Sequence, residues 1–159
     1  MGVYRICRSF TVESGHMLSK HPERCRYPHG HTRRIEIVLT GTQLNDHDMI
    51  VDFKALKLAL EETVEIFDHS MAVNSEDPMR KVLETMAPKG VVVFDHTDPT
   101  TEVIARDIFE SVQEILKSGW SGKSKSGVRY EIPRKQLTVE RVRVYETPHS
   151  WAEYGLSQL

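Results

Sequence analysis

The chain has 159 residues, 39% of them hydrophobic and 28% charged, which is the composition of a globular domain large enough to bury its own core. No apolar run approaches the ~18 residues that a membrane-spanning helix needs, so a transmembrane protein is excluded. A formal net charge of −2 gives no global reason to bind nucleic acid or an anionic membrane, and two cysteines do not make a disulfide framework in a chain of this size.

The first third of the chain predicts two long strands that pair antiparallel. Apolar and polar side chains alternate over residues 3–14 and again over 32–40, which is the period of a half-buried strand. The stretch 15–30 is polar and contains two prolines, so we expect a loop there, and 41–48 is rich in turn residues. Charged residues within the first ten positions interrupt what a secretion signal would keep apolar, and we therefore expect a cytoplasmic protein.

Two helices follow. Apolar residues recur at helical spacing over 52–67, with Asp52 placed as the N-cap. A second helix is predicted to begin at Asp98-Pro99-Thr100 and to end near Gly119. The other predicted elements are a short strand between the helices, a flexible surface loop and two C-terminal strands: 91–94, 119–127, 136–146 and 151–154. The rest of 70–97 reads as irregular.

The predicted order is therefore strand, strand, helix, helix, strand, strand. It favours an α+β fold in which an antiparallel four-stranded sheet carries two helices on one face. No internal repeat or domain boundary stands out, so residues 1–159 are expected to form a single domain.

Three histidines form the principal candidate site. If the second strand begins at His29, then His29 and His31 point to the same face, because side chains alternate along a strand. His16 lies at the end of the first strand, which antiparallel pairing would bring alongside. Three neutral imidazoles are a known catalytic zinc shell with an open fourth position, although they also suit other divalent ions, and a lone His-x-His is common on protein surfaces.

Cys25, four residues before His29, admits two interpretations. As a fourth ligand it would close a structural zinc site. As a free thiol near a metal and cationic groups it would have a lowered pKa and act as a base or nucleophile. Cys7, within the first strand, is expected to be a buried apolar side chain.

Several other polar residues are ambiguous on their own. Asp68 can orient His69 in a proton relay, but a histidine at a helix C-terminus also faces the helix dipole. Glu146 would ordinarily be a solvated charge at a strand end, and Thr100 and Thr101 would ordinarily cap a helix. The basic residues around the His-Gly-His sequence form either a solvated face or an anion site: Lys20, Arg24, Arg26, Arg33 and Arg34.

Six short motifs occur in order along the chain: Ser14-Gly15-His16, Cys25-x-x-x-His29-Gly30-His31, Val51-Asp52-Phe53, Phe67-Asp68-His69, Pro99-Thr100-Thr101-Glu102 and Glu146-Thr147-Pro148. This ordered set resembles that of the 6-pyruvoyl-tetrahydropterin synthase and 6-carboxy-tetrahydropterin synthase (QueD) family, and only 70–97 and 119–134 lie outside the resemblance. The resemblance implies the T-fold, or tunnelling fold, in which subunits join into a trimeric barrel and two barrels stack as a hexamer.

The resemblance also implies an activity and a role for each candidate residue. The substrate would be 7,8-dihydroneopterin triphosphate, and the product 6-carboxy-5,6,7,8-tetrahydropterin, a queuosine precursor, with loss of triphosphate and acetaldehyde. The alternatives are the 6-pyruvoyl product or a zinc-stabilised pterin-binding protein without turnover. The implied residues are the Zn2+ ligands His16, His29 and His31, the base Cys25, the relay Asp68 and His69 from a neighbouring subunit, and the pterin-binding Glu146, Thr100 and Thr101.

Three features depart from the family pattern. Thr32-Arg33-Arg34 stands where a small residue and an aromatic are more usual, and Pro28 replaces an aliphatic residue. The stretch 70–97 is longer than in compact members, so we interpret it as an insertion. Arg33 and this insertion could line or cover the pocket. The groups suggested for the triphosphate are some of Lys20, Arg24, Arg26 and Lys54.

Overall fold

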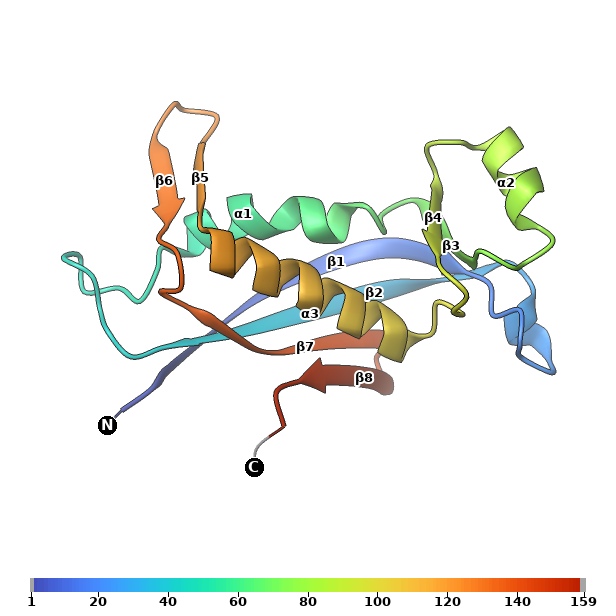
Figure 1. The fold of residues 1–159 in the computed structure, drawn as a ribbon, viewed down its shortest axis with the longest axis horizontal. Coiled ribbons are helices and arrows are strands. Elements are labelled where there is room, and N and C mark those ends of the chain that lie inside the picture. The colour runs from blue at the N-terminus through green and yellow to red at the C-terminus, as the bar shows by residue number, and fades with distance from the viewer. Residues whose placement is uncertain (1, 158–159) are drawn as a thin grey trace.

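In the computed structural model, which describes residues 2–157, two long strands cross the centre of the molecule (Figure 1). β1 (Tyr4–His16) and β2 (His29–Gly41) pair antiparallel along their whole length. The register places His16 opposite His29 and Ser14 opposite His31. The predicted antiparallel pair is confirmed, and both strands run further toward the intervening loop than their alternation indicated.

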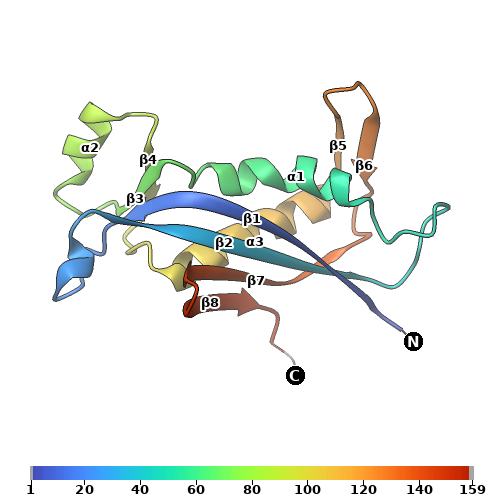
Figure 2. The same ribbon diagram turned by 180° about the vertical axis from the view of Figure 1, so that it is seen from behind.

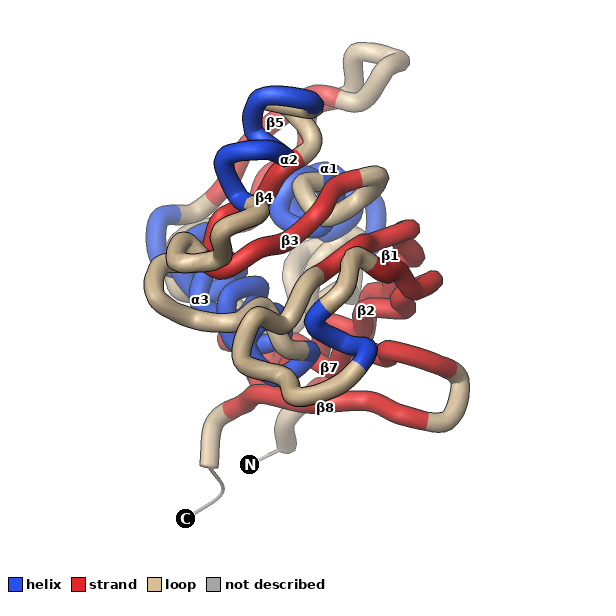
Figure 3. The backbone as a smooth tube through the Cα atoms, turned by 90° about the vertical axis from the view of Figure 1, so that its right-hand side faces the viewer, coloured by secondary structure: helices blue, strands red, loops and turns tan. Residues whose placement is uncertain are grey.

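The sheet has six strands in the order β4-β3-β1-β2-β7-β8. β7 (Thr138–Thr147) and β8 (Ser150–Gly155) extend it antiparallel from β2, whereas β3 (Ser70–Asn74) and β4 (Val91–Phe94) extend it from β1 in parallel pairings. Seen end-on, the strands succeed one another in this order from β4 down to β8 (Figure 3).

Two helices cover one face of this sheet and leave the other face open (Figure 2). α1 (Phe53–Glu65) starts at Asp52, whose side chain accepts a hydrogen bond from the Lys54 amide, and α3 (Thr101–Ser118) ends at Gly119 with a φ of 77°. The apolar stripes of these helices pack on the inward side chains of β1, β2 and β7. The fully buried residues of this core include Ile35 and Ile37 from β2, Leu56 and Leu60 from α1, and Ile104 and Ile108 from α3.

The expected four-stranded antiparallel sheet with two helices is wrong in its details, although the α+β class is confirmed. The interval 70–97 is ordered as β3, α2 (Arg80–Met86) and β4, with α2 beside β4 at one end of the sheet. β4 confirms the short strand predicted over 91–94. β3 has three consecutive buried residues, so it lacks the alternation that marks a half-buried strand and reads as irregular in the sequence.

Two further expectations are wrong. The predicted flexible loop 119–127 lies largely within a separate hairpin of β5 (Trp120–Lys123) and β6 (Arg129–Ile132). Cys7, expected to be buried, is exposed, because it alternates with the inward Ile6 and therefore lies on the open face of the sheet. Among the described helices, none combines the length and the apolar character required to cross a bilayer.

Candidate functional site

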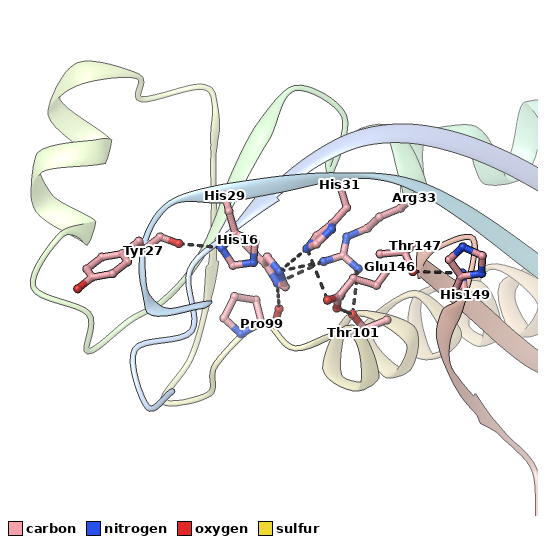
Figure 4. Close-up of polar contacts among 10 residues, drawn as sticks. All are labelled: His16, Tyr27, His29, His31, Arg33, Pro99, Thr101, Glu146, Thr147 and His149. Carbon is pink, nitrogen blue, oxygen red and sulfur yellow. Dashed lines mark hydrogen bonds and ion pairs between the residues drawn. The ribbon is translucent and has the colours of Figure 1, made fainter. Parts of the chain in front are cut away.

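Three imidazoles meet at one end of the β1–β2 pair, on the face that the helices cover (Figure 4). One ligand nitrogen from each of His16, His29 and His31 lies within 4.8 Å of the others. The Nε2 atoms of His16 and His31 are 3.2 Å apart, and His16 is 1% exposed. The register causes this convergence, because His16 and His29 are paired residues and His31 lies two positions further along the same face.

The backbone holds two of the rings in an orientation suited to metal binding. Nδ1 of His16 donates to the Pro99 carbonyl and Nδ1 of His29 donates to the Tyr27 carbonyl, each at 2.8 Å. These bonds leave Nε2 of both rings unprotonated, as is typical of histidine ligands held by a second hydrogen bond. Nε2 of His29 is buried without a partner, an arrangement that a bound cation would satisfy. The three residues therefore fit a divalent metal.

The environment also disfavours protonation of His16 and His31. Burial lowers the pKa of His16 to about 4, against an ordinary value of 6.5, and the nearby Arg33 guanidinium acts in the same direction. Burial and Arg33 lower the pKa of His31 as well. Because a metal ligand must be unprotonated, the site is prepared for a cation near neutral pH.

The depressed pKa of His16 predicts how the metal-free protein responds to acid. Between pH 6.5 and about 4 the unfolded chain binds a proton at His16 that the folded chain rejects, so the free energy of unfolding falls as the pH drops through this window. The full loss from this residue is about 3 kcal/mol. Urea unfolding of the metal-free protein at several pH values measures it. His16→Gln keeps a donor for the Pro99 carbonyl and should flatten the dependence; equal slopes in both proteins would contradict the prediction.

Glu146 and Thr101 lie together beside the histidines. The Thr101 hydroxyl, at the start of α3, donates a hydrogen bond to Oε2 of Glu146 near the end of β7, and Oε1 of Glu146 is 3.6 Å from Nε2 of His31. Burial opposes ionisation of Glu146, but the Thr101 hydrogen bond and the neighbouring His31 and Arg33 keep its pKa below the ordinary value. The site thus presents an ionised carboxylate next to the candidate metal ligands.

Thr100 is placed differently from Thr101. Its side chain caps α3 by accepting a hydrogen bond from the Val103 amide at 3.3 Å, which is the ordinary helix-capping role. It also borders a separate hollow of about 400 Å³, which Lys20 and Asp98 line as well. The Asp98 carboxylate there accepts from the Ser19 hydroxyl and the Lys20 amide, so it ties the loop after β1 to the start of α3.

Asp68 and His69 form an exposed pair just before β3. Oδ2 of Asp68 is 2.9 Å from Nδ1 of His69, and Oδ1 accepts from the Glu13 amide at 2.8 Å. The Glu13 amide and His69 lower the pKa of Asp68, and the Asp68 hydrogen bond raises that of His69. His69 borders a hollow of about 520 Å³ that His29 and His31 also line. No hydrogen bond among the described residues joins the pair to the three imidazoles.

Cys25 lies in the short 3-10 helix η1 (Arg24–Arg26), within the loop that joins β1 to β2. Its side chain is half-buried, and its carbonyl accepts a hydrogen bond from the Leu18 amide at 3.0 Å, which closes the loop at the histidine end of the strands. The metal-capable group found within residues 2–157 consists of the three histidines and does not include Cys25.

Arg33 is the residue whose place in the site the sequence left undefined. It has no exposed surface, and its Nη1 donates to the Thr101 hydroxyl at 3.0 Å. Its Nη2 lies 3.2 and 3.4 Å from the two ring nitrogens of His16. The alternation of β2 contains the signal for this position, because residues 29, 31 and 33 share one face. Arg34 alternates to the open face, so the basic cluster predicted from sequence is not a single surface.

Comparison with known proteins agrees with this architecture. The sequence profile described as 6-pyruvoyl tetrahydropterin synthase matches residues 5–156. The 6-carboxy-5,6,7,8-tetrahydropterin synthase of Aquifex aeolicus is 27% identical, with 95% of this chain and 97% of the relative covered, and that of Haemophilus influenzae is 24% identical, with 96% and 99% covered.

Two solved structures share the fold. An uncharacterized protein from Wolinella succinogenes has a TM-score of 0.74 at 19% identity, covering 99% of this chain and 100% of that one. The 6-pyruvoyl tetrahydropterin synthase of Caenorhabditis elegans has a TM-score of 0.64 at 18% identity, covering 99% and 98%. Since the profile spans nearly the whole chain, this protein belongs to the 6-pyruvoyl tetrahydropterin synthase family.

Proposed function

We propose that this chain is a zinc-dependent lyase that converts 7,8-dihydroneopterin triphosphate to 6-carboxy-5,6,7,8-tetrahydropterin, with loss of triphosphate and acetaldehyde. The observation that carries the proposal is the convergence of three imidazoles beside the Thr101–Glu146 pair. The names of the Aquifex aeolicus and Haemophilus influenzae relatives support the carboxy product. The product would serve as a precursor of queuosine-type 7-deazapurines, made in the cytoplasm.

His16, His29 and His31 would hold the metal. Three protein ligands are the set typical of a catalytic zinc site, in which the fourth position is left for water or substrate. Bound Zn2+ would supply a Lewis acid that polarises a substrate oxygen and makes the adjacent carbon more acidic. In this proposal the thiolate of Cys25 takes the proton from that carbon. Its position in the loop beside the histidine end of β1 and β2 supports this role.

Glu146 would anchor the pterin. A carboxylate can accept two hydrogen bonds from the guanidine-like edge of the pterin ring, and its lowered pKa keeps Glu146 in the ionised form that this requires. Thr101 fixes the carboxylate by donating to Oε2, which leaves Oε1 toward the histidines. Thr100, the N-cap of α3, would also contact the pterin. Lys20 lines the same hollow of about 400 Å³ as Thr100 and remains a candidate for binding the triphosphate.

We propose that the protein works as a homo-oligomer, a trimer or a hexamer built from two trimers. Asp68 and His69 are ion-paired and exposed, so they would complete the proton relay in the site of a neighbouring subunit. The uncovered face of the sheet and its edge strands β4 and β8 provide surfaces on which such subunits could pack. Light scattering that showed only monomers would contradict this part of the proposal.

The identity of the reaction product distinguishes a carboxy-forming lyase, a pyruvoyl-forming synthase and a pterin-binding protein without turnover. The zinc-loaded protein is incubated with 7,8-dihydroneopterin triphosphate, and we expect acetaldehyde and 6-carboxy-tetrahydropterin in equal amounts, measured by mass spectrometry. A pyruvoyl product without aldehyde would assign the chain to the reaction for which the Caenorhabditis elegans neighbour is named. Binding without turnover would leave a pterin-binding protein, and rapid alkylation of Cys25 with metal retained would argue against that outcome.

A further inference from the structure

Glu146 lies close to the position that a metal would take, yet it is not part of the metal-capable group. Its Oε1 is 3.6 Å from Nε2 of His31, one of the three converging nitrogens. Three histidines and one carboxylate would make a complete four-coordinate shell. Such a shell would leave no position for a substrate oxygen. A catalytic site therefore requires that the Glu146 carboxylate stay outside the metal shell.

The carboxylate is held from the other side. Oε2 of Glu146 accepts the hydroxyl of Thr101, and Nη1 of Arg33 lies 4.0 Å from the same oxygen. Nη1 also donates to the Thr101 hydroxyl at 3.0 Å, so guanidinium, hydroxyl and carboxylate form one chain of polar contacts (Figure 4). Both partners act on Oε2, on the side away from the contact with His31.

Arg33 is itself fixed in place. It has no exposed surface, its Nη2 contacts the ring of His16, and its Nε is buried without a partner. A buried guanidinium requires a nearby anion, and Glu146 is the one carboxylate that ion-pairs with it within the described chain. The charge of Arg33 therefore lies between a metal ligand and the carboxylate that could otherwise join it.

We propose that Arg33 is a positioning residue that holds Glu146 out of the metal shell and thereby keeps the fourth coordination position open. The inference rests on the proposed function only in taking the three histidines as the metal site. Without the guanidinium, Glu146 loses its cationic partner and the metal becomes the nearest positive charge. The carboxylate then closes the site, and the same movement removes it from the pterin edge.

Cobalt substitution tests this without any turnover. Co2+ in the wild-type protein should change its visible absorption when azide is added, because azide can occupy an open position. In Arg33→Met we expect Co2+ to bind roughly tenfold more tightly, measured by competition with a chelator, and azide to leave the spectrum unchanged. In Arg33→Met/Glu146→Gln, which lacks the competing carboxylate, both properties should return toward wild type.

Arg34→Met is the matched control, because Arg34 is adjacent in sequence but pairs with Glu36 on the open face. It should leave the azide response and the Co2+ affinity unchanged. An Arg33→Met protein that still responds to azide, or tighter binding that persists in the double variant, would overturn the proposal. So would weaker Co2+ binding in a variant that unfolds at the wild-type temperature. A wild-type protein that binds Co2+ and azide but converts no pterin would refute the proposed function and leave this inference standing.

Discussion

Replacing His29 with alanine is expected to remove the metal from the protein and to abolish turnover. Nε2 of His29 is buried without a partner, and the ring is oriented by the Tyr27 carbonyl, so the side chain has no other bond that explains its position. Two remaining imidazoles are too few for a stable zinc site. Metal analysis after dialysis at micromolar free zinc should give about one ion per wild-type chain and close to none in the variant.

His149→Ala provides the control, because His149 is an exposed histidine on the turn after β7, where its backbone amide donates to the Thr147 hydroxyl (Figure 4). Its metal content and turnover should equal those of the wild type. Full metal retention by His29→Ala would show that the three imidazoles are not the metal site, and the catalytic proposal would fail with them.

Replacing Cys25 with alanine is expected to lower kcat by roughly 10²–10⁴-fold, the usual contribution of a positioned acid or base. Metal content should stay unchanged, since the metal-capable group of the described chain does not contain Cys25. The two measurements together separate the interpretations of this residue. A large fall in metal content would identify Cys25 as a fourth ligand of a closed site rather than as the base.

Cys7→Ala is the matched control for the loss of a thiol. Cys7 is exposed on the open face of β1, far along the strand from the histidines. We expect its removal to leave kcat and metal content unchanged. A fall in kcat as large as that of Cys25→Ala would assign the effect to thiol loss in general and not to the loop beside the metal.

Much of the fold could be predicted because its main elements carry local patterns. The alternation in β1, β2 and β7 and the helical spacing in α1 and α3 each arise within a few residues, whatever the rest of the chain does. The strand at 91–94 was predicted and is β4, whereas β3 was missed because a short buried strand has no such pattern. The parallel pairing of β3 with β1 also joins residues that are more than fifty positions apart.

Local sequence pattern is enough to tell which side chains of the candidate site share a face. Alternation along β2 places His29, His31 and Arg33 on one side, and antiparallel pairing brings His16 to them. This much is local geometry, and it suffices to predict that three imidazoles converge.

The groups that surround the three imidazoles come from distant parts of the chain, so they become visible only in the folded structure. The Pro99 carbonyl that orients His16 is 83 residues away in sequence, and the Thr101 hydroxyl that holds Glu146 is 45 residues from it. The sequence could not show that Arg33 is buried between these groups while Arg34 is exposed. The direction of a side chain follows from its own strand, whereas its burial and its charged partners depend on how distant strands and helices pack together.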